Sequence, residues 1–453
     1  MTNPGPPTPT GGLPLIGDLL AYLRDPFGTP ARWAREIGDV VRVRGPGPPT
    51  LMLFAPGPIA DLLVKHEAAT RKSPVTRGMA CIVGRSVVTM TGEPWRRRRR
   101  LLDPAFRKDS LAHHARLAVR HADRYADRWL AAGRFEARAE LLDFMFDGLV
   151  DALTTAPLGP DRAVLRRGFA EFWADFSSRE FSLLSALTGG DPYGRLTTPR
   201  RRRQRRLLAE FDRIVARLVA HARAAPGDDL LSTLLPSADR DGGLDPTELR
   251  DDVITVILAA QETTAMGLTM TLDLLARHPA VAARLAAEAA ALPGGRLPDI
   301  DDLKSLPYAD AVVREALRLY PPIWGVAREA TAPLTVGGFA VAPGSLLVAS
   351  AWVVQRDPRW WGPDPETFRP ERWLTDDAAR PRLAWLPFGA GPHTCIGMRL
   401  ALVEMVLAVA TWSRRLQLHA DGDPPTLTTT LTIRPRSGVH LRATPPALCS
   451  SAG

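Results

Sequence analysis

The stretch FGAGPHTCIG, residues 388–397, decides the fold, because it places a single cysteine in a glycine-rich turn. The apolar run from Ile396 to about Trp412 follows at once and predicts a helix. Gly391 and Gly397 let the backbone curl close to Cys395, so that amide N–H groups can point at the sulfur. The positive end of the following helix favours a deprotonated thiol. The stretch therefore predicts a metal-binding thiolate at Cys395, against the alternative of an ordinary buried cysteine.

A long helix is predicted upstream of this turn. Residues 245–248, Asp-Pro-Thr-Glu, offer an N-cap, a proline at the first position and a glutamate at the third. Apolar periodicity then continues without a helix breaker to His278-Pro279, and about 32 residues at about 1.5 Å each cross a whole domain. Glu262 and Thr263 lie in its middle. In an isolated helix, the threonine would bond the carbonyl one turn back and the glutamate would face solvent.

The cysteine turn resembles the haem-ligand loop of the cytochrome P450 family, whose pattern is Phe-x-x-Gly-x-x-x-Cys-x-Gly. Phe388, Gly391, Cys395 and Gly397 match all four fixed positions. The resemblance implies haem b as the cofactor, with the Cys395 thiolate as the iron ligand. It also implies that Phe388, Gly389 and Gly397 lie against the cofactor.

The middle of the long helix resembles the oxygen-binding motif Ala-Gly-x-Glu-Thr-Thr of the same family. The resemblance implies that Thr263 binds dioxygen, that Glu262 and water deliver protons to it, and that Ala259 contacts the cofactor. Ala260 stands where the family usually has glycine. Its methyl group is expected to narrow the local groove.

Two further motifs follow in the family's order. Glu315 and Arg318 are three residues apart on a predicted helix, and such a pair alone is usually an exposed ion pair of little energetic weight. They resemble the family's Glu-x-x-Arg motif, and Arg372 stands where the family has the third member. The resemblance implies a buried, structural network of Glu315, Arg318 and Arg372 behind the haem loop.

Four residues resemble the family's ligands for the haem propionates. Trp95 and Arg99 lie four apart on a predicted helix, and Arg328 and His393 fall where further propionate ligands occur. His393 replaces the commoner arginine. The alternative for Arg99, Arg328 and His393 is that each is an ordinary surface cation with no role in cofactor binding.

Composition is that of a globular protein with a sizeable core: 453 residues, 45% hydrophobic and 24% charged. Length alone suggests about three domains. The motifs between Trp95 and Cys395 must converge on one site, which predicts instead a single domain over residues 13–453 after a flexible Pro-rich arm over residues 1–12. Cys81, Cys395 and Cys449 form no CxxC pair, which favours a reducing, intracellular setting.

Membrane and nucleic-acid functions are not predicted. The first ten residues contain no Lys or Arg, and the apolar stretch Leu13–Leu23 carries Asp18 and is shorter than the about 20 residues that span a bilayer. We therefore expect no membrane anchor and a cytoplasmic, soluble bacterial protein. The net charge is +9, and nearly all of the positively charged residues are arginines. The arginine-rich runs at residues 96–100 and 200–206 lack interleaved aromatic residues. No nucleic-acid partner is expected.

The resemblance implies a mainly α fold class, the P450 helical prism with a long central helix and small β regions. Helices are predicted from about Pro94 to Pro236, with breaks at Ala132-Gly133 and Thr188–Thr198. Short strands are predicted at Val40–Val43, Thr50–Phe54, Val336–Val348 and Leu427–Leu441.

The activity that the resemblance implies is that of a monooxygenase using O2. No flavin or iron–sulfur motif is recognisable in the sequence, so electrons are expected from a separate acidic ferredoxin and its NAD(P)H-dependent reductase. The ferredoxin would dock on arginines, namely Arg96, Arg97, Arg100 and Arg399. The alternatives are a haem-thiolate enzyme that uses peroxide or isomerises its substrate, against which the intact Glu262-Thr263 pair speaks, and a non-catalytic haem or ligand-binding protein.

A hydrophobic substrate is expected, because the segments that line the pocket in this family are apolar here. LPLIG at residues 13–17 and GDVV at residues 38–41 resemble bacterial members that oxidise terpenes, which favours a terpenoid over a polyketide, macrolide or fatty acid. Any candidate pocket residue can instead belong to the core. The candidates are Val75, Met79, Ile82, Phe176, Phe181, Ile257, Ala260, Ile323, Trp324, Val326 and Leu427.

Overall fold

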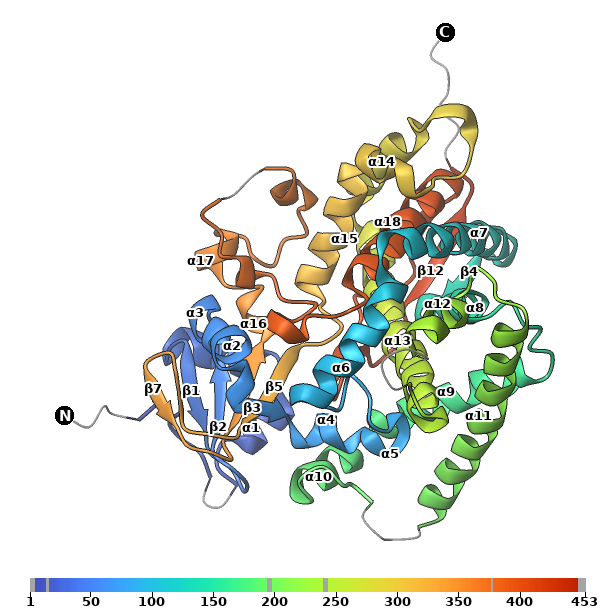
Figure 1. Ribbon diagram of the computed structural model, residues 1–453. Coiled ribbons are helices and arrows are strands. Elements are labelled where there is room, and N and C mark those ends of the chain that lie inside the picture. Colours follow the sequence, from blue (N-terminus) through green and yellow to red (C-terminus); the bar gives the residue numbers. More distant parts are fainter. Residues whose placement is uncertain (1–4, 14–15, 194–197, 239–242, 376–377, 447–453) are drawn as a thin grey trace.

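A computed structural model describes residues 5–13, 16–193, 198–238, 243–375 and 378–446. Helices make up most of the molecule, and the mixed β-sheet lies at one side of them (Figure 1). This arrangement confirms the expectation of a mainly α fold with small β regions. Pro14, Leu15 and Cys449, on which the sequence analysis drew, lie outside the described residues.

The helices differ widely in length, from the four residues of α5 to the 32 residues of α13. Those of the N-terminal half are α1 Leu19–Arg24, α2 Gly28–Glu36, α3 Pro56–Ala60, α4 Pro74–Gly78, α5 Ala80–Val83, α6 Gly92–Leu102, α7 Lys108–Ala132, α8 Ala137–Leu153, α9 Asp161–Phe176, α10 Arg179–Leu187 and α11 Pro199–Ala224. Those that follow are α12 Leu230–Ala238, α13 Pro246–Arg277, α14 Pro279–Ala290, α15 Pro307–Leu319, α16 Ala351–Val354, α17 Pro358–Trp361 and α18 Met398–Arg415.

The strands of the described residues form four small sheets. The largest has the order β1-β2-β8-β5-β3, in which only β2 and β8 pair in parallel. The others are β4-β12-β9, β10-β11 and β6-β7. The strands are β1 Val40–Val43, β2 Thr50–Leu53, β3 Thr70–Lys72, β4 Arg134–Glu136, β5 Gly325–Ala330, β6 Leu334–Val336, β7 Phe339–Val341, β8 Leu346–Ser350, β9 Gln417–Ala420, β10 Leu427–Thr429, β11 Ile433–Pro435 and β12 His440–Thr444.

Local sequence signals account for the ends of several elements. The predicted capping box is present at the start of α13, where the Asp245 carboxylate accepts from the N–H of Glu248, and the helix runs the predicted 32 residues. Gly133, with φ of +68°, ends α7. The last helix begins at Met398, two residues later than predicted, because Gly397 is its N-cap. The break between α8 and α9 was not predicted.

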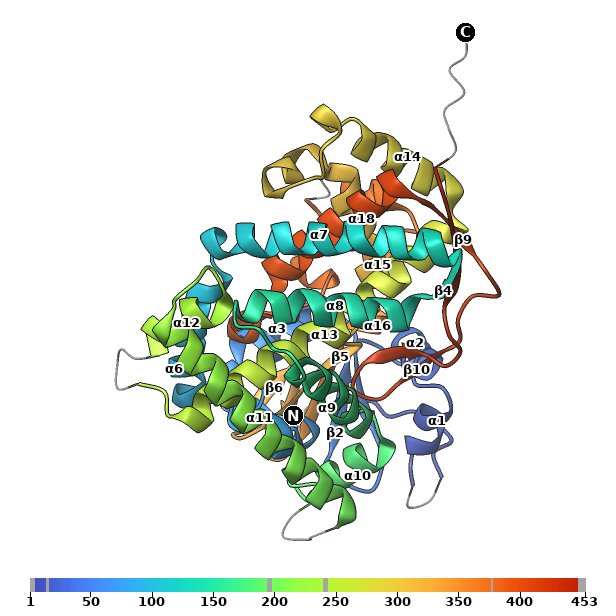
Figure 2. The same cartoon turned by 90° about the vertical axis from the view of Figure 1, so that its right-hand side faces the viewer.

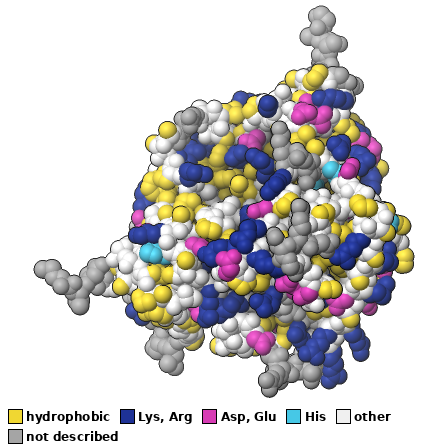
Figure 3. Space-filling view, in the orientation of Figure 1, with side chains coloured by type: hydrophobic (Ala, Val, Ile, Leu, Met, Phe, Trp, Pro, Cys, Tyr) yellow, Lys and Arg dark blue, Asp and Glu magenta, His cyan; other side chains and the backbone are white. Residues whose placement is uncertain are grey.

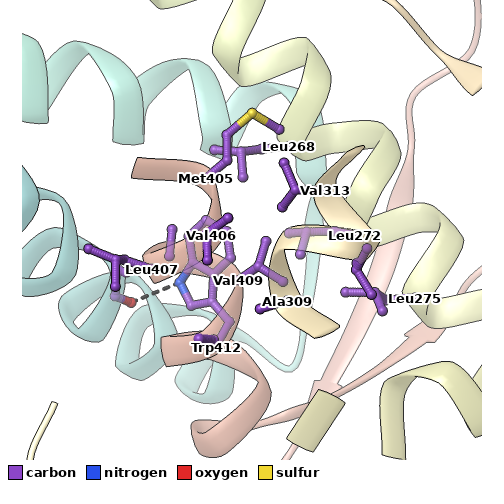
Figure 4. Packing of buried hydrophobic residues seen from close by; sticks show 14 of the residues in the cluster. Leu268, Leu272, Leu275, Ala309, Val313, Met405, Val406, Leu407, Val409 and Trp412 are labelled. Carbon is purple, nitrogen blue, oxygen red and sulfur yellow. Dashed lines mark hydrogen bonds between the residues drawn. The ribbon is translucent and has the colours of Figure 1, made fainter. Parts of the chain in front are cut away.

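The main hydrophobic core joins α13, α15 and α18 (Figure 4). Leu268 and Leu272 of α13 pack with Val313 of α15 and with Val409 of α18. The indole N–H of Trp412 donates a 2.9 Å bond to the carbonyl of Ala122 in α7, which satisfies the polar end of a buried ring. Helices α7 and α8 lie side by side against this bundle (Figure 2). The core thus holds α13 and α18 in fixed relation.

Part of the predicted N-terminal arm is held in place. The Pro7 carbonyl accepts a 2.9 Å bond from the N–H of Arg42 in β1, and the Pro9 carbonyl accepts a 2.6 Å bond from Arg44. Pro9 is buried. These bonds connect the arm to β1 and to Arg44, and the flexibility of residues 1–12 stays a prediction.

Candidate active site

The cysteine turn has a geometry that glycine makes possible. A short helical turn at Gly391–His393 precedes Cys395, whose N–H donates a 2.9 Å bond to the Phe388 carbonyl. Gly391 has φ of +69°, and a Cβ there would lie 2.1 Å from the carbonyl oxygen of Leu63. Glycine is required at position 391 because the backbone there passes close to the Leu63 carbonyl. The sequence had suggested instead that Gly391 lets the backbone come close to the Cys395 sulfur. Gly389, with φ of +68°, lies beside Val326.

Cys395 is exposed at the protein surface, and polar groups approach its sulfur. Desolvation of the sulfur by the surrounding protein raises the pKa of the thiol, and the N–H of Gly397 and the nearby Arg99 guanidinium lower it by less. Iron coordination would deprotonate the thiol regardless. Cys81 is half-buried in an apolar cluster, and burial raises the pKa of its thiol to about 12. Of these two cysteines, Cys395 is the one suited to bind metal.

Helix α6 supplies an aromatic and a cationic group to the turn. The guanidinium of Arg99 donates a 2.8 Å bond to the carbonyl of Thr394 and a 3.0 Å bond to Asp103. The Trp95 ring is buried and lies 3.8 Å, centroid to centroid, from the imidazole of His393. Trp95 and Arg99 are one helical turn apart, as predicted, and both reach the cysteine turn.

His393 lies among cations. Its Nε2 is 2.9 Å from a carboxylate oxygen of Glu67, while its Nδ1 is buried without a hydrogen-bond partner among the described residues. Burial, together with Lys72 and Arg328, lowers the pKa of His393 to about 2. An anionic group is the natural partner for this cluster.

Lys72 and Glu67 were not identified from the sequence. Lys72 is buried beside Arg328, since β3 pairs with β5 and sets these residues opposite one another. Their backbone positions are 256 residues apart in numbering, so the pairing is a tertiary feature. The strand Thr70–Lys72 is too short for alternation to be recognised.

The middle of α13 exposes one face of an otherwise buried helix. Ala259 is exposed, and Val256, Ala260 and Thr263 are half-buried, while most of their neighbours are buried. Spacings of three, four and seven residues place these four side chains on one face. Ala260 packs against the same hydrophobic cluster as Phe388, and Ile257 belongs to the cluster that Ile396 contacts. The middle of α13 and the cysteine turn are therefore linked through two shared hydrophobic clusters.

Thr263 and Glu262 differ in their surroundings. The Thr263 hydroxyl donates a 2.6 Å bond to the Ala259 carbonyl, one turn back. Glu262 is 2% exposed, and its carboxylate accepts bonds from Arg138 of α8 at 3.0 Å and from Arg434 of β11 at 2.8 Å. The glutamate therefore does not face solvent. The two arginines come from distant segments and carry no motif by which the sequence could reveal them.

The network residues lie together in the interior. Arg318 donates two 2.8 Å bonds to the Glu315 carboxylate, and Arg372 donates a 2.9 Å bond to the same group. The indole of Trp373 adds a further bond of 2.9 Å to it. These donors outweigh the effect of burial and lower the pKa of Glu315. Arg318 also bonds the carbonyl of Pro365, which fixes the segment that leads to the cysteine turn.

The arginine run of α6 splits between the surface and the interior. Arg100 is 66% exposed and its guanidinium is 3.3 Å from Glu93. Arg97 instead bonds the Gly243 carbonyl, and Arg98 is buried against Asp252 at 2.8 Å. Lys and Arg side chains gather in the central part of the face that contains α6 (Figure 3). The Arg399 side chain on α18 is also exposed.

The candidate pocket residues fall into two groups. Five are buried together in one hydrophobic cluster, the cluster that Ile396 also contacts: Met79, Ile82, Phe176, Phe181 and Ile257. Six are half-buried: Val75, Ala260, Ile323, Trp324, Val326 and Leu427. Trp324 packs toward Tyr22 of α1 and donates to the Thr430 carbonyl. Val326 lies beside Gly389, next to the cysteine turn.

These residues fit a haem. An accessible thiol with an N–H donor beside it suits the iron, and the exposed apolar face of α13 suits a flat ring. The buried cations Lys72 and Arg328, with the unpartnered Nδ1 of His393, suit the two carboxylates of such a ring. No cluster of three His, Cys, Asp or Glu residues that could hold another metal occurs in the described part of the chain.

Comparison with known proteins supports the same cofactor. The family model described as Cytochrome P450 matches residues 6–442. Cyclooctat-9-en-7-ol 5-monooxygenase of Streptomyces melanosporofaciens is 35% identical over 424 residues, 91% of this chain and 89% of that protein. Pentalenene oxygenase of Streptomyces avermitilis is 32% identical over 93% of this chain and 94% of its own length. Cyclooctatin synthase of Streptomyces melanosporofaciens is 31% identical over 96% and 93%.

Proposed function

Because this chain belongs to the cytochrome P450 family and is thus a haem-thiolate monooxygenase, we propose that it oxidises a cyclic terpenoid at the site between Cys395 and α13. The observation that carries this proposal is the exposed face in the middle of α13, a segment linked through shared hydrophobic clusters to the turn that holds the exposed Cys395. The bound haem supplies oxygen activation and insertion into a C–H bond.

Cofactor binding is assigned to residues around the cysteine turn. Cys395 is the iron ligand, and Trp95, Arg99, Arg328 and His393 hold the carboxylates. Arg99 also fixes the turn by its bond to Thr394. Phe388, Gly389, Gly397 and Ala259 provide the surfaces that the ring contacts.

Proton delivery is assigned to Thr263 and Glu262. The Thr263 proton is engaged by the Ala259 carbonyl, so the hydroxyl oxygen is free to accept a bond from water and to hold that water near the reacting oxygen. Glu262 lies next to it, with its carboxylate held by two arginines. Water that reaches this carboxylate would be the source of protons. Ala260 narrows the space beside Thr263.

An apolar substrate is supported by the side chains near the α13 face. Half-buried Val75, Val87, Val88, Val256 and Leu431 pack against the cluster that contains Ile257. Such surfaces bind hydrocarbon and offer few hydrogen bonds. By their names, two relatives act on pentalenene and cyclooctat-9-en-7-ol, both ring compounds. A cyclic terpenoid combines these features better than a polyketide, a macrolide or a fatty acid.

The electron donor is proposed to be an acidic ferredoxin served by an NAD(P)H-dependent reductase. The exposed Arg96, Arg100 and Arg399 support a cationic docking face, whereas Arg97 is engaged by Gly243 and Glu248. We place the enzyme in the cytoplasm. Helix α13 is long and apolar enough to cross a membrane, but 78% of its apolar window is buried in the core, where it serves the fold.

The substrate class is tested by ligand-induced changes in the haem spectrum and by turnover. The purified holoenzyme is titrated with cyclic sesquiterpenes, a macrolide and a linear fatty acid. Tight binding of a terpene, and incorporation of one labelled oxygen atom from O2 when ferredoxin and reductase are supplied, are expected. Tighter binding and faster oxidation of the macrolide or the fatty acid would contradict the terpenoid assignment. Equal product yield from peroxide alone would favour the peroxide-using alternative.

A further inference from the structure

The pairing of β3 with β5 brings unlike charges together on one face and like charges on the other. On the outer face, Arg71 stands opposite Glu329, and their side chains form a 2.5 Å ion pair. On the inner face, Lys72 stands opposite Arg328. Lys72 is 7% exposed and Arg328 is 6% exposed, so water screens neither charge well.

Two buried cations at directly opposed positions destabilise a sheet. Burial and the neighbouring Arg328 lower the pKa of Lys72 well below its ordinary value, and burial lowers the pKa of Arg328 to about 10. Glu67 is the carboxylate that offsets both, and it also accepts a bond from His393. One shared carboxylate leaves this cluster with an excess of positive charge.

The hydrogen-bonding capacity of the pair is largely unused within the described chain. Arg328 donates only to its neighbouring carbonyl, that of Ala327, at 3.3 Å, and the Lys72 ammonium donates to no described residue. A planar guanidinium and an ammonium that flank one position can share an anion between them. His393, with its unpartnered Nδ1, lies beside both.

We propose that Lys72 and Arg328 act as a cation pair that binds a carboxylate of the haem, so that haem retention depends on the pairing of β3 with β5. Lys72 is thus a cofactor-binding residue that no family motif identified. The inference rests on the haem assignment and not on the proposed substrate. It also explains the charges on the two faces of the strand pair. The positive charge of Arg71 on the outer face is neutralised by Glu329, and the positive charges of Lys72 and Arg328 on the inner face are neutralised by a carboxylate of the cofactor.

The test measures the rate at which holoenzyme loses haem to excess apomyoglobin. Lys72→Met is compared with Lys65→Met, which removes a 67% exposed lysine seven residues earlier in the chain. Loss of a charged hydrogen bond is expected to make haem release from the Lys72→Met variant about tenfold to a hundredfold faster. Lys65→Met is expected to release haem at the wild-type rate.

A cofactor without charged carboxylates distinguishes two roles of Lys72, namely binding a haem carboxylate and stabilising the fold. Wild-type and Lys72→Met proteins are also loaded with haem dimethyl ester, in which both carboxylates are neutral. The proposal predicts that both lose the ester at the same rate. Lys72→Gln, with less change in polarity, is expected to repeat the pattern, and Lys72→Arg is expected to keep haem nearly as well as the wild type.

Two results would overturn the proposal. Unchanged haem loss from both Lys72→Met and Lys72→Gln would show that Lys72 does not bind the cofactor. Equal acceleration with haem and with its dimethyl ester would show that Lys72 supports the fold and does not contact the carboxylate. Neither result would bear on the terpenoid assignment, which the titrations with terpenes test separately.

Discussion

The Arg99 guanidinium donates a 2.8 Å hydrogen bond to the carbonyl oxygen of Thr394, the residue before Cys395. This bond joins α6 to the cysteine turn and brings a positive charge near the sulfur, which partly offsets the rise in the pKa of the thiol that burial causes. The same helix packs the Trp95 ring against the imidazole of His393. One helix thus orients both the iron ligand and a proposed carboxylate ligand.

Thr263→Ala is expected to uncouple electron use from product formation. Without the hydroxyl oxygen, the water that delivers protons is less well held, and two electrons then leave with O2 as hydrogen peroxide. Substrate and haem binding should be retained. The measurement is peroxide formed and product formed per NAD(P)H consumed.

Thr269→Ala is the matched control for this prediction. Its hydroxyl makes the same bond to the carbonyl four residues back, at 2.7 Å, but Thr269 is fully buried. Coupling in this variant should equal that of the wild type. Equal coupling in the Thr263 and Thr269 variants would show that another group holds the water.

Glu404→Gln is expected to change how stability depends on pH. Burial raises the pKa of Glu404 to about 8, whereas an unfolded glutamate titrates near about 4.3. The folded state therefore binds the proton more tightly, and wild-type stability falls as pH rises between these two values. The glutamine variant lacks this loss, so its stability relative to the wild type should grow by about 3 kcal/mol between pH 5 and pH 7.5, within the window from about 4.3 to about 8.

Thermal unfolding of the holoenzyme at a series of pH values provides this measurement. Glu36→Gln, which removes an exposed carboxylate, serves as the control and should follow the wild-type curve. A constant difference in melting temperature between wild type and Glu404→Gln across this pH range would mean that Glu404 keeps its charge in the folded protein.

Arg318→Met is expected to destabilise the protein by about 3–5 kcal/mol, because it leaves the buried Glu315 carboxylate with fewer donors. Arg314→Met, on the same helix, removes a 32% exposed arginine paired with Asp310 and should cost at most about 1 kcal/mol. Thermal unfolding followed by circular dichroism compares the two. Similar losses would argue that the buried network adds little stability.

Reversal of Arg100 and Arg399 to glutamate is expected to raise the ferredoxin KM and leave substrate binding unchanged. Exposed charges attract an acidic partner over about 10 Å at 0.1 M salt, so ferredoxin-supported turnover should also fall as salt rises. Arg202→Glu, on α11, is the control, since this arginine is exposed but lies outside α6 and α18. If neither salt nor either charge reversal changes the ferredoxin KM, Arg100 and Arg399 do not take part in ferredoxin docking.

Short-range signals predicted the framework of the site. The Asp245-to-Glu248 capping box fixed the start of α13, and apolar periodicity gave its length. The spacing from Phe388 to Gly397 placed the cysteine turn before α18. Such features depend on residues within one or two turns, which a sequence displays directly.

The features of the site that the sequence did not predict depend on contacts between residues far apart in the chain. Lys72 meets Arg328, and Glu262 meets Arg434, only because distant segments pair in the fold. Phe176 belongs to a buried aromatic cluster, and hydrophobicity alone does not distinguish such a core residue from a pocket residue. Gly391 was recognised as necessary, but its neighbour Leu63 was not.

The identity of the iron ligand is the central claim, and the absorption spectrum of the reduced protein with carbon monoxide tests it most directly. The wild type is predicted to show the red-shifted Soret band that thiolate ligation produces, and Cys395→Ser is predicted to lose it. Cys81→Ser should keep the band, because Cys81 packs against an apolar cluster, where burial raises the pKa of its thiol to about 12 and disfavours the thiolate. Persistence of the band in Cys395→Ser would contradict the assignment of Cys395 as the haem ligand.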